Sequence, residues 1–382
     1  MVARSSTSGP SLRELTREEK LDWLQLARSA GIGPIRFHKL VGRLGSAAAA
    51  LRALPGMLAA GTVTDVVIAS REAAAAELLE LEHAGGTLLA ALEPAYPFRL
   101  RQIADPPPVL SILGDPAVLA APAVAIVGAR NASGNGCLFA RTLAAELAAS
   151  GLVVASGLAR GIDTAAHDGA LAAGGMTVAA IASGLSVPYP PENAQLARRL
   201  AASGALVSER PLDAAPQARH FPKRNRIIAG LSLGVVVVEA APGSGSLITA
   251  RLAAEQGREV MAVPGTPLDP RHKGTNQLLR DGASMVESAA DVLAVLVPLM
   301  TSARRPAEAR VPQKPPPATQ PPAAGDLAAR VEACLGPEPM PLDELVRQCG
   351  GNAAEVLDAL VDLELGGRIE RHPGNRVARR CD

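Results

Sequence analysis

The most constraining feature of the sequence is a run of four consecutive valines, Val235 to Val238, within residues 219–249. Because no polar residue alternates with the valines, the run predicts a strand that is buried on both faces. A parallel sheet covered by helices on both sides provides that environment. Cationic residues precede the run, and a Gly/Ser-rich loop follows it and opens a helix. Free backbone N–H groups at such a helix start favour an anion, so the stretch predicts a phosphate ligand.

The order of strand, glycine-rich turn and helix recurs along the middle of the chain. We expect strands at residues 124–127, 152–155, 177–182, 205–208, 235–239 and 259–263. Parallel strands with crossover helices form an α/β fold, here an extended Rossmann-like, doubly wound, mostly parallel sheet. Ligands of such sheets bind at the carboxyl ends of the strands. Small and polar residues follow each expected strand, so we expect them to converge on one crevice.

The sequence divides into four expected segments: an N-terminal helical domain (1–85), the Rossmann-like domain (86–300), a Pro/Ala-rich linker (301–325) and a winged-helix domain (326–382). In the first, two helices flank the turn Gly31-Ile-Gly-Pro34, the outline of a SAM/helix-hairpin-helix-like domain whose turn amides can contact a nucleic-acid backbone. A small helical packing domain fits the same pattern equally well. In the last, three amphipathic helices (326–335, 341–348 and 352–365) precede a β-hairpin over 368–377.

Composition excludes several classes of protein. The 382 residues carry a net charge of +1, so a nucleic-acid site must be a local concentration of cations. The four cysteines form no CxxC pair, which argues against a zinc site and a disulfide framework and fits a reducing cytoplasm. The N-terminus lacks the apolar core of a signal peptide, and no apolar run reaches the length of a membrane span. We expect a cytoplasmic protein without a metal.

The turn after the first expected strand, Gly128-Ala-Arg130, differs from the dinucleotide-binding fingerprint. Arg130 stands where a second glycine would let a pyrophosphate approach. The next strand ends at Ser156-Gly157, with no carboxylate to hold a ribose, so NAD is not expected and no cofactor is predicted. An arginine at a helix N-terminus suits a phosphate. The alternative is an arginine that only caps the helix or pairs with a neighbour.

A cationic group directly precedes the valine run. It comprises Arg219, Lys223, Arg224 and Arg226, with Phe221 and Asn225 among them. Cations along a backbone, beside an aromatic ring on which bases stack at about 1–3 kcal/mol each, are typical of single-strand binding. Aromatic residues make up only 2% of the chain, so a chance position for Phe221 is less favoured. The alternative is a solvated charged surface.

Two other features favour structural interpretations over catalysis or DNA reading. Asp163 and His167 share a helix face and could form an acid/base pair, although capping and orientation are commoner roles for such a pair. The expected recognition helix of the C-terminal domain is acidic, which would repel phosphates and favours protein contact or weak contact through the wing. The acidic residues are Glu355, Asp358, Asp362 and Glu364, and the basic wing carries Arg368, Arg371, Arg376, Arg379 and Arg380.

These motifs together resemble the DNA-processing protein A family, also called DprA or Smf, of bacterial transformation and recombination. The resemblance covers roughly residues 95–290 and rests on Tyr96-Pro, Gly128-Ala-Arg130, Ser156-Gly-Leu-Ala-Arg-Gly-Ile-Asp163, Gly184-Leu-Ser-Val-Pro-Tyr-Pro-Pro-Glu-Asn193, Phe221-Pro-Lys-Arg-Asn-Arg-Ile-Ile-Ala-Gly-Leu-Ser232 and Ser244-Gly-Ser-Leu-Ile-Thr-Ala250. It implies a non-enzymatic protein that binds and protects single-stranded DNA without base specificity, forms a homodimer through the Rossmann-like domain and helps to load the RecA recombinase.

By matching position, the resemblance assigns the DNA site to residues of the strand ends, the cationic group and the Gly/Ser loop. They are Gly128, Arg130, Ser156, Gly157, Arg160, Arg219, Phe221, Lys223, Arg224, Asn225, Arg226, Ser244, Gly245 and Ser246. Two other functions compete with this one. A phosphoribohydrolase-like enzyme would need a carboxylate where alignment of the Gly/Ser loop places Thr249. A transcription factor would need tight duplex binding by the winged helix alone.

Overall fold

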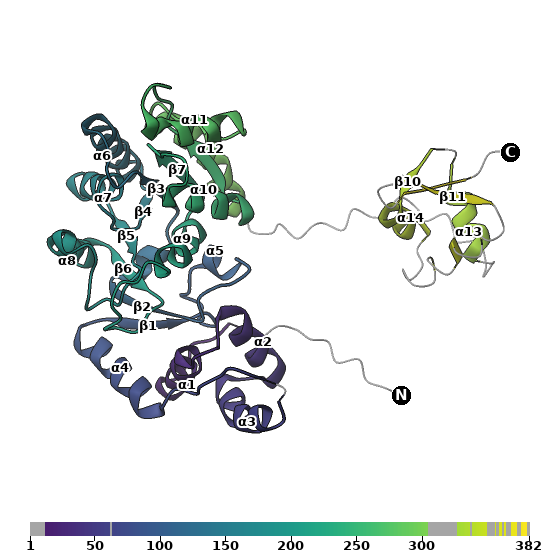
Figure 1. Ribbon diagram of the computed structural model, residues 1–382, viewed down its shortest axis with the longest axis horizontal. Helices are drawn as coiled ribbons and strands as arrows, with labels where there is room; N and C mark the ends of the chain where they lie inside the picture. Colours follow the sequence, from purple (N-terminus) through teal and green to yellow (C-terminus); the bar gives the residue numbers. More distant parts are fainter. Residues whose placement is uncertain are drawn as a thin grey trace. The chain divides into compact units, whose positions relative to one another are not determined.

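A computed structural model of the chain describes residues 12–61, 63–304, 327–336, 338–349, 356, 359–360, 363, 368–372 and 376–379. The chain divides into two compact units, Met1–Arg305 and Pro306–Asp382. The first unit contains both the N-terminal helices and the central sheet (Figure 1). The N-terminal helices therefore pack with the sheet, which allows a site between them.

The N-terminal helices are α1 (Arg17–Arg28), α2 (Pro34–Leu44), α3 (Ala47–Ala59) and α4 (Arg71–His83). Helix α1 begins at a capping box in which Thr16 and Glu19 satisfy each other's backbone N–H groups. Trp23 of α1 packs on Phe37 of α2 with ring centroids 4.9 Å apart. The expected turn, residues 31–34, joins these two helices, as predicted.

The central sheet has nine strands in the order β1-β2-β6-β5-β4-β3-β7-β8-β9. The strands are β1 (Thr87–Ala90), β2 (Val109–Gly114), β3 (Ala123–Gly128), β4 (Val153–Ser156), β5 (Thr177–Ala180), β6 (Ala205–Ser208), β7 (Gly234–Val238), β8 (Glu259–Ala262) and β9 (Ser284–Met285). All pairs from β6 to β9 are parallel, whereas β2 is antiparallel to both β1 and β6. The predicted doubly wound, mostly parallel sheet is confirmed.

Helices cover both faces of this sheet. They are α5 (Phe98–Arg101), α6 (Gly134–Ala149), α7 (Ile162–Ala172), α8 (Ala194–Ser203), α9 (His220–Leu231), α10 (Gly245–Glu255), α11 (Lys273–Arg280) and α12 (Ala289–Arg304), with short 3-10 turns at Pro116–Ala120, Pro191–Asn193 and Pro270–His272. Val235 and Val237 pack with α9 and α10, while Val236 and Val238 pack with α6, α7 and α12. The valine run is therefore buried on both faces, as predicted.

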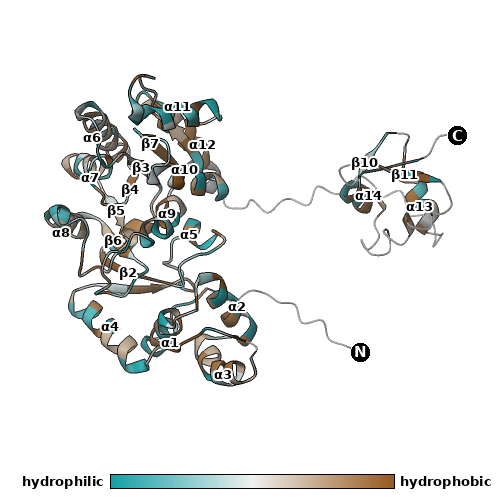
Figure 2. Cartoon of the chain, viewed as in Figure 1, coloured by the Kyte–Doolittle hydropathy of each residue, from teal (hydrophilic) through white to brown (hydrophobic). Residues whose placement is uncertain are grey.

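Hydropathy follows the same layering. Figure 2 shows hydrophobic residues concentrated on the strands and on helix surfaces turned toward them, with hydrophilic residues on the outer helix surfaces. Two buried clusters of apolar side chains, one on each side of the sheet, form the core of the first unit. This rigid double layer fixes the loops at the carboxyl ends of the strands.

The structure adds elements that the sequence did not predict. Strands β1 and β2 lie before the first expected strand, and β9 extends the opposite edge of the sheet. The cationic group lies within or just before helix α9. Helix α12 runs to Arg304, into the first residues of the expected linker, and the rest of that linker lies outside the described residues.

The second unit contains α13 (Leu327–Cys334), β10 (Met340–Pro341), α14 (Leu342–Cys349), β11 (Ile369–His372) and β12 (Arg376–Arg379). The strands form an antiparallel sheet in the order β10-β12-β11, which includes the expected hairpin. Apolar residues such as Val331, Leu345 and Val377 form its core. Most of the expected third helix lies outside the described residues, including Glu355, Asp358, Asp362 and Glu364, as does Arg380.

Candidate nucleic-acid interface

The sheet has a topological switch point between β3 and β7. After β3, the chain adds β4, β5 and β6 on one side, and β7 then pairs with the other side of β3. The loops that leave β3 and β7 therefore diverge and open a crevice, the usual ligand position in such sheets. A cleft of about 650 Å³ lies there. We call it the switch-point cleft; its lining includes Gly128, Arg130, Tyr189, Phe221, Arg224, Asn225, Ser244, Gly245 and Ser246.

Helix α6 begins beside this cleft, but the Glu239 carboxylate and the Ser133 hydroxyl already hold the N–H groups of Ser133 and Gly136 at its start. The Glu239 carboxylate accepts hydrogen bonds from the Ser133 hydroxyl and, at 2.9 Å, from the Ser133 backbone N–H. The Ser133 hydroxyl oxygen accepts from the Gly136 N–H at 2.9 Å. Glu239 is 2% exposed and has a positive φ of 55°. A buried carboxylate thus occupies the place at α6 where a phosphate would bind.

A carboxylate also holds backbone N–H groups in the turn that enters helix α7. The Asp163 carboxylate accepts hydrogen bonds from the N–H groups of Gly157 at 3.1 Å and Ala159 at 3.3 Å. Burial raises the pKa of Asp163, while the nearby Arg224 guanidinium and these N–H groups act in the opposite direction. Asp163 therefore caps the turn that enters α7.

His167 does not pair with Asp163. Its Nδ1 lies 2.7 Å from the Thr177 hydroxyl, whose proton is donated to the Val154 carbonyl, so Nδ1 is the donor to Thr177. Burial lowers the pKa of His167 to about 3, which keeps the imidazole neutral. The geometry agrees with the capping and orienting roles and gives no acid/base pair.

Helix α10 differs from α6 and α7. Ser244 occupies the N-cap position without a side-chain cap hydrogen bond, and its hydroxyl lies 2.8 Å from that of Ser246. The backbone N–H groups of Gly245 and Ser246 have no acceptor within the part of the chain that the structure describes. Both residues line the switch-point cleft. The start of α10 therefore offers N–H donors and a positive helix end to an anion in the cleft.

An aromatic and cationic cluster lies opposite that helix start. The Arg130 guanidinium carbon lies 5.0 Å from the centroid of the Phe221 ring, within the range of a cation–π contact. Tyr189 meets Phe221 edge to face, with ring centroids 5.7 Å apart. Arg130 is exposed and Phe221 is half-buried. The cluster combines a charge for a phosphate with a π-surface on which a base can stack.

Helix α9 supplies the floor of the cleft. Arg224 is 4% exposed and donates to the carbonyl oxygens of Gly157, at 2.7 Å, and Ala180, at the ends of β4 and β5. Burial lowers its pKa to about 10. A Cβ at position 157 would lie 2.2 Å from the Arg224 Nη1, so Arg224 requires glycine there. Asn225 donates from Nδ2 to the Gly245 carbonyl at 3.1 Å and so joins α9 to the start of α10.

Six predicted site residues do not line the switch-point cleft itself, although one of them, Arg160, lines a small adjoining pocket with Tyr189 and Phe221. Ser156 is fully buried and donates to the Ile126 carbonyl at 2.7 Å. Arg160 pairs with Glu192, and Arg219 donates to Gln217 at 2.9 Å. The other three are Gly157, which packs on Arg224, and Lys223 and Arg226, which line a second cavity on the other side of the first turn of α9. The cationic group is therefore divided between two cavities.

Sequence reasoning also missed functional candidates. Tyr189 stands beside Phe221 in the cleft; it lies within the 184–193 motif of the family resemblance and is one of two tyrosines, yet it was not predicted as a site residue. Glu239, expected only as the last residue of a strand, is the acceptor at the start of α6. Its partner Ser133 lies 106 residues away, so only the fold brings them together.

Known proteins resemble this chain over all three of its folded parts. The family described as DNA recombination-mediator protein A matches residues 87–297, which is more than half of the 382 residues. The chain belongs to the DNA-processing protein A family. The DprA-like N-terminal HHH domain matches residues 17–79, and the DprA winged helix domain matches residues 314–375. The predicted order of domains is that of DprA proteins.

Individual DprA relatives agree with this assignment. Protein Smf of Escherichia coli is 38% identical over 317 residues, covering 81% of this chain and 83% of the relative. The solved structure of DprA from Streptococcus pneumoniae superposes with a TM-score of 0.62 at 33% identity, covering 74% of this chain and 98% of that one. A DprA structure from Helicobacter pylori, described as showing a unique single-stranded DNA binding mode, matches with a TM-score of 0.51 at 31% identity. The match covers 56% of this chain and 96% of that one.

Two further properties of this DprA family member concern its described residues only. Within them, no group of three or more His, Cys, Asp or Glu side chains could hold a metal ion. No helix among them is long and apolar enough to cross a membrane.

Proposed function

We propose that this DprA family member binds single-stranded DNA in the switch-point cleft of a cytoplasmic protein, without base specificity, and protects the strand. One observation carries the proposal: the free N–H groups that start α10 face the same cleft as Arg130 and Phe221. Amides and a guanidinium group hold phosphates, while an aromatic ring stacks on a base.

The chemistry of the cleft favours a single strand over a duplex. A base can stack on the Arg130 and Phe221 cluster only when it is unpaired, because paired bases already stack on each other in the helix. Contacts from backbone N–H groups and guanidinium groups go to phosphates and carry no base information. The single-stranded DNA binding described for the Helicobacter pylori relative supports the same substrate class.

The cleft favours binding without catalysis. Thr249 stands where the enzyme alternative needs a carboxylate; it is 2% exposed, and its hydroxyl lies 3.4 Å from the Gly245 carbonyl. Asp163 is the carboxylate among the described lining residues, and it is engaged by two backbone N–H groups. The phosphoribohydrolase-like alternative therefore lacks its acid/base group. Release of a free base from nucleoside monophosphates would contradict this part of the proposal.

The family resemblance supports two further parts of the proposal: homodimer formation through the Rossmann-like domain, and delivery of the bound strand to RecA. Light scattering should give twice the chain mass in solution. The protein should accelerate RecA filament growth on a single strand, measured by RecA ATP hydrolysis. A monomer with no effect on RecA would remove both parts and leave the DNA site untouched.

We further propose that the winged-helix domain contacts protein or the DNA backbone weakly through its wing. Arg368 at the start of the hairpin pairs with Glu332 of α13, so part of the wing charge is neutralised internally. The transcription-factor alternative predicts that residues 326–382 bind a duplex tightly. A gel-shift assay comparing the full chain with a variant that ends at residue 325 separates the alternatives, since a winged-helix reader would lose duplex binding on truncation.

Fluorescence anisotropy with labelled oligonucleotides tests the DNA-binding proposal. We expect binding to single strands of mixed sequence and to oligothymidylate with similar affinity, and weaker binding to the duplex. Affinity should fall as salt rises, with a slope of about 0.7 per phosphate contact on a log–log plot. Preference for the duplex, or for one base sequence, would contradict the proposal.

A further inference from the structure

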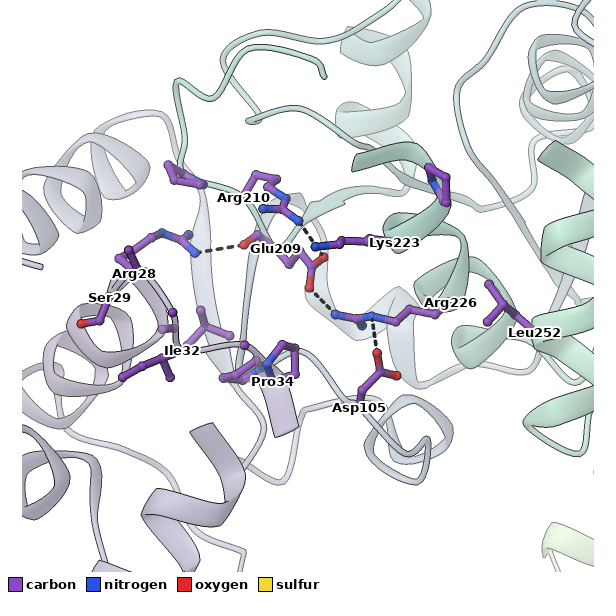
Figure 3. A pocket seen from close by; sticks show the side chains of 18 of the residues that line it. Arg28, Ser29, Ile32, Pro34, Asp105, Glu209, Arg210, Lys223, Arg226 and Leu252 are labelled. Carbon is purple, nitrogen blue, oxygen red and sulfur yellow. Dashed lines mark hydrogen bonds and ion pairs between the residues drawn. The ribbon is translucent and has the colours of Figure 1, made fainter. Parts of the chain in front are cut away.

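A second cavity, of about 830 Å³, lies between the N-terminal helices and the Rossmann-like domain. We call it the inter-domain cavity. Its walls are the end of α1, the turn at residues 31–34, the end of β6 and the outer sides of α9 and α10 (Figure 3). Pro222 and Ile248 line both this cavity and the switch-point cleft, so the two hollows meet at a shared ridge.

Cations outnumber carboxylates in the inter-domain cavity. Its lining includes Arg28, Arg210, Lys223, Arg226 and Arg251, against Asp105 and Glu209. Figure 3 shows the cationic side chains gathered around Glu209, with Arg28 on one side and Arg226 on the other. The Glu209 carboxylate pairs with Arg226 and lies 3.6 Å from Arg210, whereas Arg28 donates to the Glu209 backbone carbonyl and pairs with Glu77. Among the lining residues, positive charge remains in excess.

The partners of these cations show where that charge remains available. Arg226 is 6% exposed; it pairs with Asp105 at 3.1 Å and with Glu209, yet its Nη1 has no partner among the described residues. Lys223 is exposed and has no hydrogen bond or ion pair within the described residues. Arg251 reaches only Glu255, at 3.6 Å, with 70% of its side chain exposed.

The same charge excess acts on Arg210. Burial lowers the pKa of Arg210, Glu209 raises it, and the neighbouring Arg28, Arg226 and Arg219 lower it further. The nearest carboxylate oxygen of Glu209 is 3.6 Å away. An anion that entered the cavity would relieve this repulsion among the guanidinium groups.

The turn before α2 adds backbone donors to the opposite wall. The N–H groups of Gly31 and Gly33 have no acceptor in the described part of the chain, and Gly33 caps α2 without a side-chain hydrogen bond. Gly31 has a φ of +81°, and a Cβ there would lie 1.9 Å from the Asp65 carbonyl oxygen, so the tight turn requires glycine. The positive end of α2 thus faces the cations of the Rossmann-like domain.

We infer that the DNA strand held in the switch-point cleft continues over the Pro222 and Ile248 ridge into the inter-domain cavity. There its phosphates contact Lys223, Arg210 and Arg251 from one side and the N–H groups of the 31–34 turn from the other. This inference rests on the proposed single-strand binding and extends it, because it gives the N-terminal domain a direct share of the DNA contact.

The inference predicts a dependence on strand length. A strand of about 5 nucleotides fills the switch-point cleft alone, whereas one of about 15 nucleotides reaches both cavities; both lengths lie within the range of site sizes of single-strand binders. Changes in the inter-domain cavity should therefore weaken the long strand and leave the short one unaffected. Changes in the switch-point cleft should weaken both.

Gly33→Asp and Arg251→Ala test this in the full chain. Gly33 has a φ within the ordinary range and no atom within 4 Å of a built Cβ, so a side chain fits there. An aspartate at this N-cap stabilises α2 while placing a negative charge at the cavity wall. Gly33→Ser is the matched control, since serine also caps the helix but is neutral. Arg52→Ala, at an exposed arginine on α3 outside both cavities, controls for net charge.

For the long oligothymidylate, we expect Gly33→Asp to lower affinity about tenfold and Arg251→Ala a few-fold, in line with the strength of hydrogen bonds to charged groups. For the short one, neither should change affinity, while Arg130→Ala should weaken both lengths. If Arg130→Ala weakens both lengths but Gly33→Asp and Arg251→Ala change neither, this inference fails and the proposed function stands. If the wild-type protein does not bind the short strand, the proposed function fails. Equal losses at both lengths for Gly33→Asp would also overturn the inference.

Discussion

The starts of α6 and α10 are the same kind of element at the same edge of the same sheet, yet they differ in whether a ligand can use them. Both follow a parallel strand and a small-residue turn. At α6, the buried carboxylate of Glu239 takes the backbone N–H of Ser133, whereas at α10 the N–H groups of Gly245 and Ser246 have no acceptor among the described residues. An anion site therefore depends on what the fold leaves unpaired.

This difference is the physical basis for proposing that the cleft binds phosphates of a strand but not a dinucleotide. In a dinucleotide-binding sheet, the helix after the first strand holds the pyrophosphate. Here the Glu239 carboxylate occupies that position, and Asp163 holds the N–H groups of the turn that enters α7. The open start of α10 lies across the switch point, next to Arg130 and Phe221. We infer that the cleft selects a strand with spaced phosphates and bases over a compact nucleotide.

A carboxylate at the start of α10, like the one at the start of α6, should have the largest effect on single-strand affinity. Gly245→Asp places a carboxylate on the first turn of α10, and no atom lies within 4 Å of a built Cβ there. We expect single-strand affinity to fall about 100-fold, because the free N–H groups gain an internal acceptor and the phosphate meets a like charge. Thermal stability should stay the same or rise, since an acid suits this end of a helix. Gly245→Ala is the control and should bind normally in anisotropy assays.

Removing the charge opposite α10 should have the next largest effect. Arg130→Ala should lower affinity about tenfold and reduce the salt slope by about 0.7, the loss of one phosphate contact. Arg141→Ala, which removes an exposed arginine of α6 outside the cleft, serves as the control. A salt titration in which both variants match the wild type would place the phosphate elsewhere.

Phe221→Ala tests the aromatic part of the switch-point cleft. The lost stacking should cost about fivefold in affinity with a nearly unchanged salt slope. Phe221→Tyr keeps the ring and should bind like the wild type. Wild-type affinity in both Phe221→Ala and Phe221→Tyr would mean that the ring does not stack on a base.

Removing the carboxylate charge at the start of α6 should have the smallest effect on DNA binding. Glu239→Gln removes the charge that occupies the start of α6, so we expect a loss of stability of about 1 kcal/mol, measured by urea denaturation. Single-strand affinity should change by less than about twofold, since α6 lies off the phosphate path. A large gain in affinity would break the comparison, because it would mean that α6 binds DNA once its carboxylate is neutral.

The sheet could be predicted because its signals are local. Four successive valines and the repeated strand–turn–helix pattern specify buried parallel strands without reference to the rest of the chain. Strand β2 was missed because it follows the prolines at 106–108 and pairs with β6, nearly a hundred positions away. The place of Arg130 and of the Gly/Ser loop followed from the rule that strand ends converge.

The division of the cationic group could not be predicted. Lys223 and Phe221 are two positions apart, and only a helix at this point turns them toward different cavities. Arg224 looked like a DNA contact, but its guanidinium group ties α9 to the ends of β4 and β5. A combined Lys223 and Arg224 substitution would therefore mix loss of binding with loss of stability, because removing a buried, bonded charge costs about 3–5 kcal/mol.

The most direct measurement follows the backbone N–H groups themselves by NMR, in protein labelled with ¹⁵N at glycine and serine, as an oligothymidylate is added. The N–H signals of Gly245 and Ser246 should move strongly, because they gain a phosphate acceptor. Those of Ser133 and Gly157 should move little, because carboxylates already hold them. Large shifts at Ser133 and Gly157 with none at Gly245 and Ser246 would contradict the account.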